Sequence, residues 1–187
     1  MAETIEKIVV RNDDGRVTRE IWPLPNDEAS MEALYSDLFG NHWDKLTFGP
    51  MLSGGAYELK CPKKPEKISV SGGYLTVHWG RGGHFHLCIG ESSAGSPEQV
   101  RERMPAKVEL VRGMDKEGHP VTWSLQVENG KGESTLAIYF PNPFVTDDDG
   151  LTDDPDWSRL ALWHDVLATY AGDKPDGRDT MSKGFRF

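Results

Sequence analysis

Residues 56–140 alternate between apolar and polar side chains, and this period of two constrains the fold more than any other feature of the sequence. Six segments follow the pattern, most of them joined by glycine-containing turns: 56–60, 74–79, 84–89, 107–112, 121–127 and 134–140. Short alternating runs bounded by turn residues are typical of strands that bury one face. The pattern therefore predicts an antiparallel meander.

The N-terminal region predicts a hairpin followed by a helix. Segments 8–10 and 17–22 flank an Asn-Asp-Asp-Gly turn, which is a strong hairpin signal. Over residues 30–39 the apolar side chains follow the i, i+3, i+4, i+7 spacing of a helix with one buried face. We expect Asn26 or Asp27 to cap this helix.

A short helix is expected at residues 96–103, and a longer one closes the sheet region. In the longer helix, Asp154 is the expected cap, Pro155 the first helical residue and Gly172 the end. The expected fold class is α+β, with a single antiparallel sheet of about six or seven strands packed by an N-terminal and a C-terminal helix.

Length and composition predict one globular domain. The chain has 187 residues, of which 37% are hydrophobic and 27% are charged. At about 150 residues per domain, we expect a single domain over residues 1–172 and a polar C-terminal tail over residues 173–187. No apolar run approaches the roughly 20 residues of a membrane span, so a membrane protein is not expected.

Charge and cysteine content limit the partners and the compartment. The net charge of −9 repels phosphate groups, so neither nucleic acid nor an anionic membrane is an expected partner. A small-molecule or protein partner is left open. The N-terminus has no basic start followed by an apolar stretch, and Cys61 and Cys88 form no Cys-x-x-Cys pair. Both features predict a cytoplasmic protein with reduced thiols.

The segment 74–90 offers the one testable chemical idea. Its alternation predicts a hairpin with a three-residue loop at 81–83, in which Leu75, Val77, Trp79, Phe85, Leu87 and Ile89 share the buried face. The opposite face then presents histidines. His78 is expected opposite His86, with His84 beside them.

Three histidines in this arrangement predict a transition-metal site. His84 and His86 emerge about 6.6 Å apart on one strand, and cross-strand neighbours stand about 5 Å apart. We therefore predict that His78, His84 and His86 bind one metal ion, with zinc or iron as the leading cofactors and nickel or copper also suited to imidazole. Cys88 lies about 13 Å along the strand from His84, too far to share that ion.

Other interpretations of the same face stay open. The histidines could simply face solvent or bond to a carboxylate, or they could line an organic ligand pocket. The glycine-rich turn at 80–83 could also hold an anion through its backbone N–H groups. A non-catalytic module that binds a protein or small ligand without metal is therefore the alternative function. The sequence identifies no catalytic residue and leaves open whether the protein is an enzyme.

The remaining candidates carry weaker signals. The acidic run 147–156 lacks the spacing of an EF-hand and is expected to be a solvated loop before a helix. His164 is expected at the edge of the packed face of the last helix. His42 and His119 could each supply a fourth metal ligand only if the fold brings them close. Gly-x-Ser-x-Gly and phosphate-binding glycine motifs do not occur.

Several motifs together resemble a family of small uncharacterised bacterial proteins. They are His-Trp-Asp at 42–44, Phe-Gly-Pro at 48–50, Gly-Tyr-Leu-Thr-Val at 73–77, His-Phe-His-Leu-Cys-Ile-Gly at 84–90, Pro-Asn-Pro-Phe at 141–144 and Asp-Trp-Ser-Arg-Leu-Ala-Leu-Trp at 156–163. The resemblance covers about residues 40–172. It implies one bacterial domain spanning hairpin, sheet and final helix, and it assigns no role to any residue.

Overall fold

The computed structural model describes residues 4–185, so the first three residues and the last two of the expected C-terminal tail lie outside the described residues. The chain forms two compact units. The first contains the segments up to Leu24, Glu109–Leu125 and from Tyr139 onward, and the second contains Pro25–Val108 and Gln126–Ile138. The single domain over 1–172 stays a prediction. No helix in the described part of the chain is long and apolar enough to cross a membrane.

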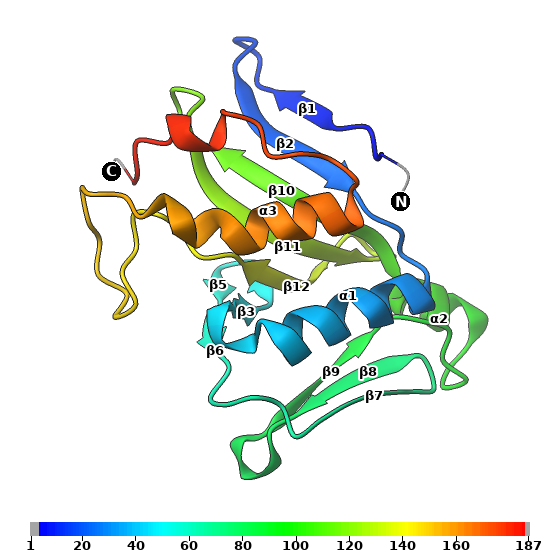
Figure 1. Ribbon diagram of the computed structural model, residues 1–187. Coiled ribbons are helices and arrows are strands. Elements are labelled where there is room, and N and C mark those ends of the chain that lie inside the picture. The colour runs from blue at the N-terminus through cyan, green and yellow to red at the C-terminus, as the bar shows by residue number, and fades with distance from the viewer. Residues whose placement is uncertain (1–3, 186–187) are drawn as a thin grey trace. The chain divides into compact units, whose positions relative to one another are not determined.

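The fold is α+β and contains a seven-stranded antiparallel sheet, which confirms the expected class (Figure 1). The strand order is β1-β2-β10-β11-β12-β3-β6, with the bounds Ile8–Arg11 (β1), Val17–Pro23 (β2), Pro105–Met114 (β10), Pro120–Asn129 (β11), Ser134–Tyr139 (β12), Thr47–Gly49 (β3) and Leu59–Lys60 (β6). The order is not a simple meander, because β2 pairs with β10.

Two smaller sheets add to this plan. A three-stranded sheet has the order β7-β8-β9, with the bounds Lys67–Ser71 (β7), Tyr74–His78 (β8) and His84–Cys88 (β9). A two-stranded sheet joins Met51–Leu52 (β4) to Gly55–Ala56 (β5). The hairpin with the histidines therefore belongs to a sheet of its own. The expected strand at 56–60 is replaced by β5 and β6.

In the first unit, tryptophans pack between the strands and the last helix. Ala161–Tyr170 form this helix (α3), which follows a 3-10 turn at Trp157–Leu160. Trp163 is fully buried and meets Trp22 edge to face at 5.7 Å between ring centroids. Asp156 caps the turn by accepting from the Ser158 N–H at 3.0 Å, so Asp154 is not the cap.

In the second unit, the first helix forms as its sequence predicts. Glu28–Asn41 form α1, and Asp27 caps it by accepting from the Ser30 N–H at 3.1 Å. The predicted apolar stripe is buried, with Phe39 added to Met31, Leu34, Tyr35 and Leu38. Figure 1 shows α1 running beside the β7-β8-β9 sheet.

An aromatic cluster joins α1 to this sheet. Phe39 contacts Trp79 and Phe85, with centroids 6.4 Å and 5.3 Å away, and Phe48 lies within 6 Å of the same two rings. One face of the β8–β9 hairpin is therefore fixed by packing. A short helix, Pro97–Arg103 (α2), follows the hairpin and begins with a capping box between Ser96 and Gln99.

Candidate functional site

The loop of the β8–β9 hairpin determines where the histidines lie. It consists of residues 80–82 and is closed by a hydrogen bond from the Trp79 N–H to the Gly83 oxygen, 2.9 Å long. Gly80 and Gly83 both have positive φ, +63° and +97°, which side chains rarely adopt. The loop thus begins one residue earlier than the sequence predicts, and glycine fills both left-handed positions that this loop uses.

The earlier loop shifts each cross-strand partner by two residues. His78 lies opposite His84, so the prediction that it lies opposite His86 is wrong. A shift of two preserves the faces, since side chains alternate with a period of two. The expected apolar face is accordingly buried at Leu75, Val77, Trp79, Leu87 and Ile89, and half-buried at Phe85.

The three predicted histidines gather on the opposite face. His84 and His86 are exposed, and their ring centroids lie 4.9 Å apart with an interplanar angle of 67°. His78 is half-buried and stacks on His84 at 5.6 Å and 22°. Stacked rings direct their faces, not their in-plane nitrogen lone pairs, at each other. His84 and His86 are therefore the better placed pair for one ion.

The hydrogen bonds of the rings separate the histidines further. The Gly80 N–H donates to His78 Nδ1 at 3.1 Å, so in neutral His78 this nitrogen holds the lone pair and Nε2 holds the proton. His78 has no lone pair to offer a metal unless this bond breaks. His86 Nδ1 forms a 2.8 Å hydrogen bond with the Thr76 hydroxyl, so Nε2 is the ring nitrogen that does not take part in this bond.

Cys88 lies on the same strand but is protected. Its Sγ donates to the Gly90 oxygen at 3.5 Å, and burial raises the pKa of the thiol. Cys61 is also free of a disulfide, and burial raises its pKa to about 12. Both thiols are thus mainly protonated near neutral pH, which is typical of inert cysteines.

The other candidate residues have local partners. His42 Nε2 lies 3.8 Å from Asp37 Oδ1, and His164 Nε2 lies 3.0 Å from Asp179 Oδ2. In the acidic run, Asp147 pairs with Arg159, and most of its other carboxylates are exposed. The run acts as a solvated loop whose last member caps the following helix.

Sequence reasoning missed a buried ionic network in the first unit. The Arg112 side chain is 1% exposed, as are those of its partners Glu20 and Asp179. Asp176, from the expected polar tail, also bonds to this guanidinium at 2.8 Å. A signal was present: Val108, Leu110 and Arg112 have the same parity on β10, so an arginine occupies a core-facing position.

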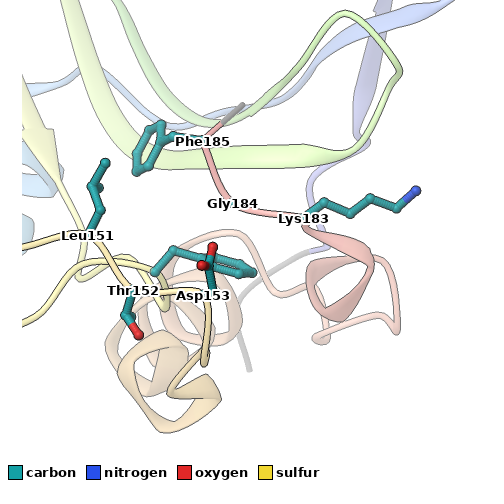
Figure 2. Close-up of a pocket in the computed structure, with 7 residues that line it drawn as sticks. Leu151, Thr152, Asp153, Lys183, Gly184 and Phe185 are labelled. Carbon is teal, nitrogen blue, oxygen red and sulfur yellow. The ribbon is translucent and has the colours of Figure 1, made fainter. Parts of the chain in front are cut away.

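A pocket of about 180 Å³ lies in the first unit. Figure 2 shows its wall, where Leu151 and Asp153 come from one segment and Lys183 and Phe185 from another. Pockets for small organic ligands usually measure about 300–1,000 Å³, so this one is small for that purpose.

Comparisons with known proteins place the fold and the family. The chain is similar to the crystal structure of ChuX, with a TM-score of 0.50 and 14% identity over 81% of this chain and 76% of that chain. Identity this low shows the fold alone. No curated protein matches the sequence. The model of DUF7676 matches residues 7–172, a range that contains all the motifs of the resemblance. The chain therefore belongs to DUF7676, a family of unknown function.

Proposed function

We propose that this protein binds a divalent transition-metal ion, such as Zn²⁺ or Cu²⁺, through the imidazoles of His84 and His86. The observation that supports the proposal is their placement side by side, two residues apart on β9, with ring centroids 4.9 Å apart. His78 would join them as a third ligand only by releasing the Gly80 N–H.

The ring separation suits two ligands of one ion. A nitrogen binds zinc at about 2.0–2.1 Å, which places the ring centre about 3.2 Å from the metal. Two rings that subtend 90–109° at the ion then have centres about 4.5–5.2 Å apart. The 4.9 Å between the two ring centroids on β9 falls within this range. To bind one ion, the rings therefore need only to rotate and do not need to move closer together.

Thr76 supports the same assignment. A metal-binding histidine usually bonds through its second ring nitrogen to a neighbouring group, which fixes the ring and its tautomer. The Thr76 hydroxyl can do this for His86 Nδ1, leaving His86 Nε2 as the metal-binding atom. Thr76 is thus a positioning residue.

The alternative function, a module that binds a protein or small ligand without metal, has less support. The pocket in Figure 2 is small, and it contains no histidine. The proposal also includes a cytoplasmic location, supported by two free thiols, and excludes nucleic acid and anionic membranes as partners on the net charge of −9.

The test follows the imidazole resonances by NMR in protein without a histidine tag, during titration with Zn²⁺ at pH 7.5. We expect the signals of His84 and His86 to respond together, and His84→Ala to abolish the response of His86. Thr76→Val should weaken binding about 10–100-fold. His42→Ala is the matched control, because the His42 ring lies beside Asp37, 3.8 Å from its Oδ1, and its loss should change neither signal. If neither ring responds to saturating Zn²⁺ or Cu²⁺, the proposal is wrong.

A further inference from the structure

The turn between β10 and β11 brings two carboxylates and an imidazole together in the first unit. Asp115, Glu117 and His119 each offer one ligand atom, and these atoms lie within 4.8 Å of one another. Among the described residues, these are the three potential metal-ligating side chains whose ligand atoms lie this close together. The histidines of the β8–β9 hairpin do not form such a group as they stand.

The backbone of this turn is held rigidly. Asp115 Oδ1 accepts from the Glu117 N–H at 2.8 Å and from the His119 N–H at 2.9 Å. The Asp115 N–H donates to the His119 oxygen at 2.8 Å, and Gly118 supplies the positive φ of +86° that the turn needs. Because Oδ1 carries the turn bonds, Oδ2 of Asp115 faces the imidazole.

The imidazole nitrogen at the centre of the group has no hydrogen bond. His119 Nδ1 is buried and has no hydrogen-bond partner among the described residues. It lies 3.4 Å from Asp115 Oδ2 and 3.6 Å from Glu117 Oε2. A buried polar atom without a well-formed hydrogen bond is costly, and an ion bound between this nitrogen and its two carboxylate neighbours would satisfy all three groups.

These two distances match the edges of a metal coordination polyhedron. Tetrahedral ligands at about 2.0–2.2 Å from zinc lie about 3.3–3.6 Å from one another. A nitrogen and two carboxylate oxygens at such separations stand too far apart for good hydrogen bonds, but at the spacing that a shared ion requires.

Charge and exposure are also suitable. Asp115 and Glu117 bring two carboxyl groups to the turn, each with one oxygen close to the imidazole. Asp115 and His119 are 15% and 18% exposed and Glu117 is 49% exposed, so the site opens to solvent on the side of Glu117.

We infer that Asp115, Glu117 and His119 form a second metal site, which binds Zn²⁺ through Asp115 Oδ2, Glu117 Oε2 and His119 Nδ1. The fourth position is open to water, as in zinc sites with three protein ligands. Two carboxylates and a neutral imidazole balance the charge of a divalent ion. This site does not depend on the proposal for His84 and His86.

The test uses the full chain with His84→Ala and His86→Ala, so that the hairpin pair cannot contribute. Titration with Zn²⁺ at pH 7.5, in competition with a chromophoric chelator, should still show one bound equivalent. Substituting Co²⁺ should give the intense visible absorption of a tetrahedral site. Ca²⁺, which prefers six to eight oxygen ligands, should not compete.

Further variants in this background identify the ligands. Glu117→Gln and His119→Gln should each weaken Zn²⁺ binding more than tenfold, because changes outside the coordination sphere already cost about 10–100-fold. Asp115→Asn keeps an oxygen for the turn and removes the charge. Asp13→Asn, an exposed acid in the β1–β2 turn, is the matched control and should leave affinity unchanged.

Two results would overturn the inference. One is the absence of bound Zn²⁺ in the His84→Ala, His86→Ala protein while its circular dichroism matches the wild type. The other is Zn²⁺ binding that His119→Gln and Glu117→Gln leave unchanged. The imidazole resonances of His84 and His86 report on the hairpin pair separately, so failure of one site is distinguishable from failure of the other.

Discussion

Removing the buried Arg112 guanidinium should destabilise the protein more than any loss of a surface charge. Arg112 Nε donates to Glu20 Oε2 at 2.7 Å and Nη1 donates to Asp179 Oδ1 at 2.8 Å, with all three side chains 1% exposed. In Arg112→Met, both carboxylates lose their shared cation but stay in the core. Breaking a buried ion pair in this way costs about 3–5 kcal/mol.

The remaining partners determine how that cost is divided. Glu20 keeps Arg178 at 2.6 Å and Lys7 at 3.2 Å, both partly exposed. Among residues 4–185, the Asp179 carboxylate keeps two side-chain donors, the Trp123 Nε1–H at 2.6 Å and His164 Nε2 at 3.0 Å, neither of which carries a permanent charge. The penalty therefore falls mainly on Asp179, and a second substitution, Asp179→Asn, should recover part of it.

Urea denaturation, monitored by tryptophan fluorescence, measures these free energies of unfolding. Arg16→Met is the matched control: Arg16 is 54% exposed and lies 3.5 Å from Asp14, which is 72% exposed, so its loss should cost less than about 1 kcal/mol. A loss below about 1 kcal/mol for Arg112→Met would refute the reasoning, because it would mean that the two carboxylates are solvated or protonated without their cation.

Three further predictions concern the core, acid stability and the thiols. Leu87→Ala, at a side chain 4% exposed, should lower the free energy of unfolding by about 2–5 kcal/mol in urea titrations, and a loss well below 1 kcal/mol would place Leu87 at the surface. The hydrogen bond from Arg112 lowers the pKa of Asp176 to about 2, so its contribution to stability should be present above the unfolded pKa of about 3.9 and should disappear as the pH falls through about 2. In acid titrations Asp176→Asn should flatten this dependence, and an unchanged curve would contradict the assignment. Iodoacetamide should modify Cys88 and Cys61 only slowly in the native state at pH 7.5, since burial raises both pKa values; fast modification of Cys88 followed by mass spectrometry would revive a thiolate role.

Local signals predicted the elements that depend on local physics. The cap and the apolar stripe of α1 depend only on near neighbours, and both are confirmed at Asp27 and along the buried face. The start of α2 is likewise set by Ser96 and Pro97. Strand β7 was missed because Lys67–Ser71 is short and contains only two apolar residues.

The alternation correctly predicts the face of the hairpin on which the histidines lie, but it does not predict the register between β8 and β9. Alternation determines which face a side chain occupies, and it is insensitive to a shift of two residues. The choice between loops at 80–82 and 81–83 depends on which glycines adopt positive φ, and Gly80, Gly82 and Gly83 all permit it. Local sequence could therefore assign His78, His84 and His86 to one face but could not decide which two lie opposite each other.

The partners of Arg112 could not be identified from the sequence because they come from distant segments. Asp176 and Asp179 stand 64 and 67 residues from Arg112 in the chain, in a stretch whose polarity suggests a solvated tail. Only the parity of Arg112 on β10 indicated that a charge points into the core, and such a charge requires partners. The right conclusion from that parity was that some acidic segment must return to cover it.

The two proposed metal sites differ in how much order a bound ion must impose. His84 and His86 are exposed side chains on a strand, and only His86 has a hydrogen bond to hold its ring among those described above, so binding must restrict the His84 rotamer. At the β10–β11 turn, two backbone N–H groups already hold Asp115, and the His119 ring is largely buried. Ligands that are fixed before binding lose less conformational entropy, and this lowers the cost of association. A site built from residues i, i+2 and i+4 of one tight turn should therefore bind Zn²⁺ more tightly than the more conspicuous histidine pair.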